Sequence, residues 1–209
     1  LRQCGALAVL FPEVDALFGV PAPEKWHPEI DTGIHTLMVM KVIAELSNNV
    51  DIRFSALCHD LGKALTPPDI WPSHPNHGEA GIPLIETLCA RLKVPTTARD
   101  LARLAARYHD KIHVINKLPA NELIAIFDGL DSWRKPERIE QLSLISEADA
   151  RGRLGLEQQT YPQGIYFKQA FTIAQAVDVK PIVEQGFKGP EIRQELTKQR
   201  IEAVTDWQQ

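Results

Sequence analysis

The chain has 209 residues, a formal net charge of −4 and 44% hydrophobic residues. This length fits one domain, or one domain with an appendage, and the hydrophobic content is enough for a buried core, which excludes a disordered chain. The longest apolar runs are too short to span a membrane, and no signal peptide opens the sequence. The charge balance excludes a globally basic nucleic-acid binder, so an RNA contact would need a local patch.

Cysteine usage bears on the compartment. The three cysteines are odd in number and lack metal-type spacing, which favours a reducing cytosol over a disulfide framework. We therefore expect a cytoplasmic protein that makes no membrane contact. Because the sequence begins at Leu1, we also expect a fragment of a longer protein.

The first elements in chain order are short. Residues 1–18 predict a short helix that is interrupted at Pro12, and Pro21 and Pro23 then predict an extended connector.

The next helix carries a histidine on its apolar face. Asp31 or Thr32 is expected to cap a helix that runs to about Leu46. Its inward stripe includes Met38, Val39, Val42 and Leu46. His35 lies four residues before Val39, at the end of this stripe, and we interpret it as a metal ligand because of the motif that follows.

That motif is the hexapeptide Cys-His-Asp-Leu-Gly-Lys at residues 58–63. It follows a predicted helix over residues 51–57, with Asp51 as the expected cap. His59 and Asp60 offer an imidazole nitrogen and a carboxylate oxygen, which divalent metals accept. Neighbouring helical residues point about 100° apart, so both bind one metal only if other segments complete the shell. The dipeptide alone is a weak signal.

A proline-rich stretch separates this motif from the next helix. Residues 65–75 contain four prolines and predict a loop. Asn76 is expected to cap a helix that starts at His77. Gly78 and Gly81 keep its first turn thin, which serves either helix packing or a site.

A further helix is predicted from Thr96 or Thr97 to His109. Its outer face carries Arg99, Arg103 and Arg107. A charge run of this kind is usually a solvated face, and contact with RNA or phosphate is the alternative.

The remaining chain also shows helical patterns. They cover residues 121–130, a segment from Pro136, and residues 164–177 and 190–204. No stretch alternates with period two for long, and no internal repeat is visible. The sequence therefore predicts an all-α architecture.

The helix from Pro136 places a carboxylate on its buried face, because Asp149 falls seven residues after Leu142. An unpaired buried charge costs several kcal/mol, so Asp149 must meet a cation. A bound metal is one candidate. Arg151 and Arg153 either bind phosphate or themselves pair with Asp149.

The inward polar groups form one set, consisting of His35, His59, Asp60 and Asp149. Two imidazoles and two carboxylates without a thiolate disfavour a structural zinc site and suit Mn, Fe, Co, Ni or Mg. The order His…His-Asp…Asp in an all-helical chain resembles the HD superfamily of metal-dependent phosphohydrolases. The resemblance implies an HD-domain helical bundle with extra C-terminal helices.

The metal count stays open at this point. His77 and His109 lie where two-metal members of the superfamily carry extra histidines, with Asp60 as the bridging carboxylate. They are expected to hold a second metal or to contact substrate. Spacing alone does not decide between one metal and two.

A narrower resemblance rests on residues 11–19, 27–36, 58–63 and 187–192. These segments are similar to the carboxy-terminal HD region of the long bacterial CCA-adding enzymes, the tRNA nucleotidyltransferases. The nucleotidyltransferase head of that family, with its Gly-Ser motif and catalytic aspartates, is missing from this sequence. The chain is therefore not expected to add CCA by itself.

This resemblance implies hydrolysis of 2′,3′-cyclic nucleotides, 2′-nucleotides and simple phosphate esters, at the tRNA 3′ end or on free nucleotides. It implies Ni²⁺ or Mg²⁺ as the metal, with Mn²⁺ and Co²⁺ as alternatives. A bound divalent metal lowers the pKa of its water and neutralises phosphoryl oxygens. Lys63, about one helical turn after the ligand pair, is expected to contact phosphate.

Two other functions remain to be weighed. The first is a non-catalytic module that binds tRNA or forms a homodimer, with a structural or vestigial metal. The second is a cyclic-dinucleotide phosphodiesterase of the HD-GYP type, which we set aside because Tyr161-Pro162 falls in the wrong place for that signature. A complete ligand set favours the enzyme.

The resemblance also predicts the domain organisation. Residues 1–24 are expected to connect to the missing nucleotidyltransferase part. Residues 25–155 are expected to form the HD core, and residues 156–209 a helical extension packed on it.

Overall fold

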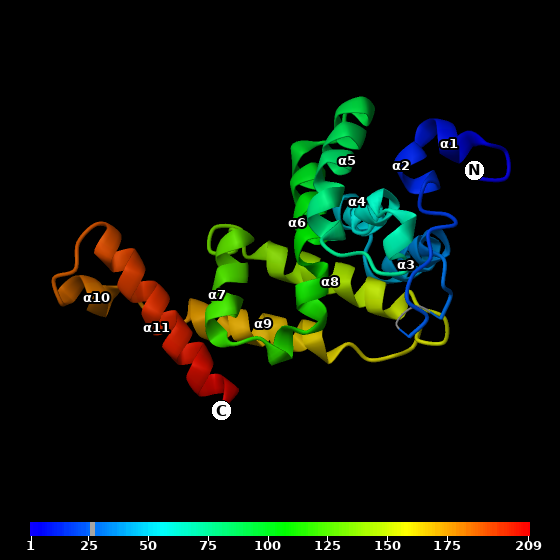
Figure 1. Ribbon diagram of the computed structural model, residues 1–209. Helices are drawn as coiled ribbons and strands as arrows, with labels where there is room; N and C mark the ends of the chain where they lie inside the picture. The colour runs from blue at the N-terminus through cyan, green and yellow to red at the C-terminus, as the bar shows by residue number, and fades with distance from the viewer. Residues whose placement is uncertain (26–27) are drawn as a thin grey trace. The chain divides into compact units, whose positions relative to one another are not determined.

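The computed structural model describes residues 1–25 and 28–209. Trp26 and His27 lie outside the described residues, and His27 is the first residue of the second segment of the resemblance. Regular structure in the described ranges is helical, apart from an isolated bridge between Pro21 and Asp31 (Figure 1). The predicted all-α architecture is confirmed. Within the same ranges, no helix is both long enough and apolar enough to cross a membrane.

The chain divides into two compact units that alternate along the sequence. The first contains Leu1–His113 and Leu144–Tyr161, and the second contains Val114–Ser143 and Pro162–Gln209. Helix α8, Glu137–Arg151, begins in the second unit and ends in the first. The sequential boundaries at residues 24 and 155 stay a prediction.

The first unit holds all the predicted site residues. Its elements are α1 (Ala6–Leu10), α2 (Pro12–Asp15), α3 (Thr32–Leu46), α4 (Val50–Cys58), α5 (His77–Leu92), α6 (Thr96–His113), the end of α8, and the short 3-10 helices η1 (Leu61–Leu65) and η2 (Pro68–Ile70). A buried cluster joins α2, α4, η1, α5 and α6. It consists of Val14, Leu17, Cys58, Leu61, Ile85, Leu88, Cys89, Ala102 and Ala106.

The helix starts show which caps the sequence identified. Asp31 caps α3 as predicted, since its Oδ1 accepts a hydrogen bond from the backbone N–H of Ile34 at 2.9 Å. The prediction that Asp51 caps α4 is wrong. Asn49 is the cap, with its Oδ1 2.8 Å from the Asp51 nitrogen, and Asp51 lies in the first turn. Asparagine and aspartate are both good helix caps, and an aspartate is also favourable in the first turn of a helix. The sequence around Asn49 and Asp51 is therefore compatible with a cap at either residue.

Three other local predictions need correction. Helix α6 ends at His113, one turn beyond the predicted end at His109. The predicted loop 65–75 contains the 3-10 helix η2. Asn76 precedes α5 as expected, but it has a left-handed backbone (φ 58°) and its side chain makes no cap hydrogen bond. Asparagine tolerates this backbone conformation better than most residues.

Backbone contact at glycines positions the start of α5. A Cβ at Gly62 of η1 would collide with the carbonyl oxygen of His77, and one at Gly78 would collide with the carbonyl oxygen of Ala106 on α6. Helix packing therefore accounts for Gly78. The same close approach holds His77 beside the hexapeptide.

The second unit contains α7 (Ala120–Gly129), α9 (Pro162–Gln175), α10 (Lys180–Glu184), α11 (Pro190–Gln208), the 3-10 helix η3 (Ile115–Lys117) and the start of α8. Aromatic rings form its core. Phe127 stacks on Phe167 with ring centroids 5.6 Å apart, and Trp133 stacks on Phe171 at 5.4 Å. The guanidinium of Arg200 lies 3.6 Å from the centroid of the Trp133 ring. The five-residue helix α10 was not predicted.

Candidate metal centre

Three histidines direct the same ring nitrogen into the centre of the first unit. In each, the Nδ1–H donates to a backbone carbonyl oxygen. The acceptors are Ala56 for His59 at 2.7 Å, His74 for His77 at 2.9 Å and Ala105 for His109 at 3.0 Å. In the neutral form of each imidazole, these bonds fix the tautomer and put the lone pair on Nε2, where it can bind a metal.

His35, on α3, is oriented by two acceptors. Its Nδ1 lies 3.0 Å from the carbonyl oxygen of Gly152 and 3.0 Å from Oε1 of Glu29. Its Nε2 lies 2.9 Å from Oδ1 of Asp149, at the end of α8. Both imidazole and carboxylate are buried, as their predicted inward positions require. Glu29 was not predicted as a site residue.

The carboxylate of Asp60 faces two groups of histidines. Its Oδ2 lies 3.3 Å from Nε2 of His59 and 3.9 Å from Nε2 of His35. Its Oδ1 lies 3.2 Å from Nε2 of His77 and 3.6 Å from Nε2 of His109. The turn after α4 therefore places Asp60 between the two groups.

These residues fit a divalent cation. Within the described ranges, His59 Nε2 and Asp60 Oδ1 are buried and have no hydrogen-bond partner. A buried polar atom left unsatisfied costs about 1–3 kcal/mol, and a metal bound to both would remove this cost. Three sets of ligand atoms each lie within 4.8 Å of one another. They are His35, His59 and Asp149; His59, Asp60 and His109; and His77, His109 and Asp110.

The opposite charges of the site stabilise the ionised forms of its side chains. Burial opposes the charged form of Asp60, but His59 and Lys63 hold its pKa well below the usual range. Burial likewise opposes a charge on His59, yet Asp60 and Asp149 raise the pKa of His59 to about 10. Both carboxylates thus remain ionised at neutral pH, because the pKa of Asp149 is also lowered, against its burial, by His113.

Two residues at the edge of the site were missed. The carboxylate of Asp110 is 66% exposed and lies 3.5 Å from Nε2 of His77. His113 lies with its Nε2 2.6 Å from Oδ2 of Asp149. A signal for His113 was present, because it follows His109 by four residues and residues at this spacing share a helix face.

The predicted phosphate-binding residues separate in the structure. Lys63 is buried, and its Nζ lies 2.7 Å from Oδ2 of Asp60. Arg153 lies with Nη2 3.7 Å from Oδ1 of Asp149. Arg151 instead donates from Nη1 to Oε1 of Glu147 at 2.8 Å, so its guanidinium is engaged outside the ligand set.

The arginines on the outer face of α6 all have acidic neighbours. The pairs are Arg99 with Asp100 at 3.0 Å, Arg103 with Glu86 at 3.3 Å, and Arg107 with Glu79. A guanidinium that is paired with a carboxylate attracts the phosphates of a nucleic-acid backbone less strongly than an unpaired one does. Contact with RNA along this face stays a prediction.

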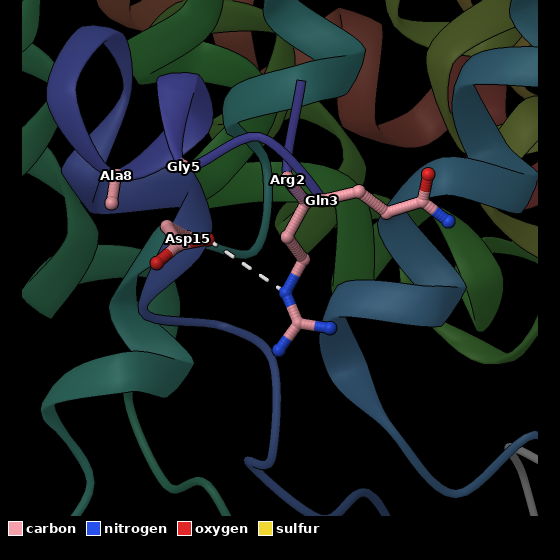
Figure 2. A pocket seen from close by; sticks show the side chains of 5 residues that line it. All are labelled: Arg2, Gln3, Gly5, Ala8 and Asp15. Atoms are coloured by element: carbon pink, nitrogen blue, oxygen red, sulfur yellow. Dashed lines mark ion pairs between the residues drawn. The ribbon is translucent and has the colours of Figure 1, made fainter.

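A pocket lies near the start of the chain, away from these ligands in sequence (Figure 2). It is lined by Arg2, Gln3, Gly5, Ala8 and Asp15. Nε of Arg2 lies 3.7 Å from Oδ1 of Asp15, and Arg2 is mostly exposed. None of the predicted site residues lines this pocket.

The comparison with protein families agrees with the geometry. The HD domain model matches residues 32–151, which is more than half of the chain. The match begins at the first residue of α3 and ends at the last residue of α8, so it spans His35 to Asp149. A search of the solved structures finds no match to this chain. On the family match, the chain belongs to the HD domain family, a superfamily of metal-dependent phosphohydrolases.

Proposed function

We propose that this chain is a metal-dependent phosphohydrolase that acts on 2′,3′-cyclic nucleotides, 2′-nucleotides and simple phosphate esters. The observation that carries the proposal is a pair of buried atoms, His59 Nε2 and Asp60 Oδ1, which have no hydrogen-bond partner among the described residues and lie within a cluster of imidazoles and carboxylates. When bound there, a divalent cation supplies an acidified water and neutralises phosphoryl oxygens.

For this proposal we group the ligands into two sets, one on each side of Asp60. His35, His59, Asp60 and Asp149 would hold one cation, and His77, His109 and Asp110 would hold a second one beside Asp60. The Asp60 carboxylate is suited to this shared position because each of its oxygens faces a different set. We propose two metals on this ground, with Ni²⁺, Mg²⁺, Mn²⁺ or Co²⁺ as ions that accept this donor set.

One basic side chain next to the metal ligands, that of Arg153, is partly exposed to solvent. The side chains of His35 and His59 are 0% exposed, whereas the side chain of Arg153 is 17% exposed. A guanidinium beside Asp149 can bind a phosphoryl oxygen in a bidentate manner. Arg153 is therefore the residue we assign to phosphate binding, in preference to Arg151.

The substrate class rests on the sequence resemblance alone. The hexapeptide 58–63 and the segments 11–19, 27–36 and 187–192 are similar to the HD region of CCA-adding enzymes. That similarity supports a role in repairing tRNA 3′ ends as part of a larger enzyme. The family match extends to metal-dependent phosphohydrolases and no further.

The experiment is a metal add-back assay on the purified chain. The protein is treated with a chelator and dialysed, then supplied separately with Ni²⁺, Mg²⁺, Mn²⁺ or Co²⁺. Turnover is measured on 2′,3′-cyclic AMP, 2′-AMP and, as a matched control, 3′-AMP. We expect chelation to abolish turnover, metal to restore it, and 2′-AMP to be preferred over 3′-AMP. The surface variant Arg99→Gln should behave as the wild type does.

The alternative function gives a different result in the same samples. A non-catalytic module that binds tRNA or a second subunit would take up metal and show no turnover on any of these substrates. Hydrolysis of simple esters without preference for 2′-AMP would support phosphohydrolase activity but contradict the proposal that 2′-nucleotides are the substrates.

A further inference from the structure

The last turn of α6 brings His113 to the carboxylate of Asp149. His113 Nε2 lies 2.6 Å from Asp149 Oδ2, and the rings of His109 and His113 have centroids 6.3 Å apart. His113 therefore lies beside the ligand cluster and contacts one of its carboxylates directly.

The second nitrogen of His113 is also engaged. The hydroxyl oxygen of Tyr161 lies 2.9 Å from Nδ1 of His113, and the two rings meet edge to face with centroids 5.8 Å apart. Burial raises the pKa of Tyr161, so the hydroxyl keeps its proton. In the neutral imidazole, Tyr161 donates to Nδ1 while the Nε2–H donates to Asp149. Rotation of the ring would break both bonds.

In this arrangement the two carboxylate oxygens of Asp149 contact different groups. Oδ1 faces the ligand nitrogens, at 2.9 Å from His35 Nε2 and 3.7 Å from His59 Nε2. Oδ2 faces His113 alone among these imidazoles. Tyr161 lies beyond residues 32–151, so the contact adds a residue of this chain that the family match does not include.

We propose that His113, held by the hydroxyl of Tyr161, is a positioning residue that occupies Asp149 Oδ2 and leaves Oδ1 to bind the metal. This inference rests on the metal centre proposed above. A carboxylate held by one oxygen keeps its orientation and cannot add the second oxygen to the metal. Residues that orient ligands in this way commonly contribute about 10–100-fold to metal affinity.

The test uses Co²⁺ as the probe, because its visible absorption reports coordination number. Affinity is measured by calorimetry and the absorption spectrum is recorded on the same samples. His113→Leu removes the donor and should weaken Co²⁺ binding about 10–100-fold and change the spectrum, because Oδ2 becomes free to coordinate. His113→Gln retains an N–H donor near the Nε2 position and should restore most of the affinity and the wild-type spectrum.

A substitution at Tyr161 tests the same contact with a smaller change and has a matched control. Tyr161→Phe removes only the hydroxyl and should weaken Co²⁺ binding less than His113→Leu does. Tyr166→Phe is the control, because its hydroxyl also takes part in a hydrogen bond, which it accepts from Gln208 at 2.8 Å, and Tyr166 is not among the residues of the site. It should leave affinity and spectrum unchanged. Circular dichroism identifies any variant that fails to fold.

Two results would overturn the inference while leaving the metal centre in place. Wild-type affinity and spectrum in folded His113→Leu would show that Asp149 needs no such support. Equal losses in His113→Gln and His113→Leu would make His113 a ligand of the metal instead. A wild-type chain that binds no Co²⁺, Ni²⁺ or Mg²⁺ would remove the proposed function and this inference together.

Discussion

The ammonium group of Lys63 lies 2.7 Å from Oδ2 of Asp60, so the lysine of the hexapeptide pairs with the carboxylate of the same hexapeptide. Lys63 is only 7% exposed, and a buried ammonium of this kind needs such a partner. The pair keeps Asp60 ionised and also places a positive charge at the metal centre. Lys63 thus has a structural role beside its predicted contact with phosphate.

The two roles of Lys63 predict opposite effects of Lys63→Gln on binding and turnover. Removing a cation beside Asp60 should make divalent metal bind more tightly, because one repulsive charge is lost. Turnover should fall about 10²-fold if the ammonium also stabilises phosphoryl charge. Calorimetry with Mn²⁺ and turnover on 2′-AMP measure the two effects, with exposed Lys93→Gln as the control. Unchanged turnover in Lys63→Gln would contradict the predicted contact between Lys63 and phosphate.

Proton release should accompany metal binding. In the metal-free site the pKa of His59 is about 10, above its ordinary value of 6.5, so His59 is protonated at pH 7.5. A metal can bind Nε2 only after this proton leaves. The apparent association constant should therefore rise as pH rises toward 10, about tenfold per pH unit for each proton displaced. Calorimetry in buffers of different ionisation enthalpy counts the protons. An affinity independent of pH between 6.5 and 8.5 would contradict the charge state of the site.

The second set of ligands predicts a change in stoichiometry. His77→Ala and His109→Ala should each lower bound metal by about one ion per chain, with a large loss of rate. His77 Nε2 and His109 Nε2 lie 3.2 Å apart, so both variants act on the same position. Elemental analysis after dialysis gives the count. Unchanged metal content would assign both histidines to substrate contact.

Gly62→Ala tests how the hexapeptide is packed against α5. The added Cβ would collide with the carbonyl oxygen of His77, and backbone atoms cannot move aside as a flexible side chain can. We expect a loss of about 3 kcal/mol in the free energy of unfolding, measured with urea. Gly155→Ala is the control, since its Cβ meets nothing within 4 Å and only its φ of +82° is unfavourable, which costs about 1 kcal/mol. Equal stability of the two variants would contradict the close contact.

Local patterns in the sequence were sufficient for part of the fold. Apolar spacing and capping residues predicted the all-α architecture and the bounds of α3, and the buried position of Asp149 followed from its spacing to Leu142. The same spacing rule would have included His113, had the helix been extended by one turn. Its omission was an error in a boundary, which is the least certain part of such a prediction.

Contacts between distant segments could not be predicted from the sequence. Glu29 reaches His35 from the irregular segment before α3, and Tyr161 reaches His113 across 48 positions of the chain. Neither residue belongs to a periodic pattern, so no local rule identifies it. The pairing of Lys63 with Asp60 also depends on a 3-10 turn that the helical pattern did not indicate.

The central claim is tested most directly by measuring metal content and turnover together in Asp60→Asn. This variant keeps the size of the side chain but removes the charge that both ligand sets share. We predict that bound metal and hydrolysis of 2′-AMP fall together, while circular dichroism shows unchanged helical content. Full metal content with full turnover in the folded variant would contradict the metal centre proposed here.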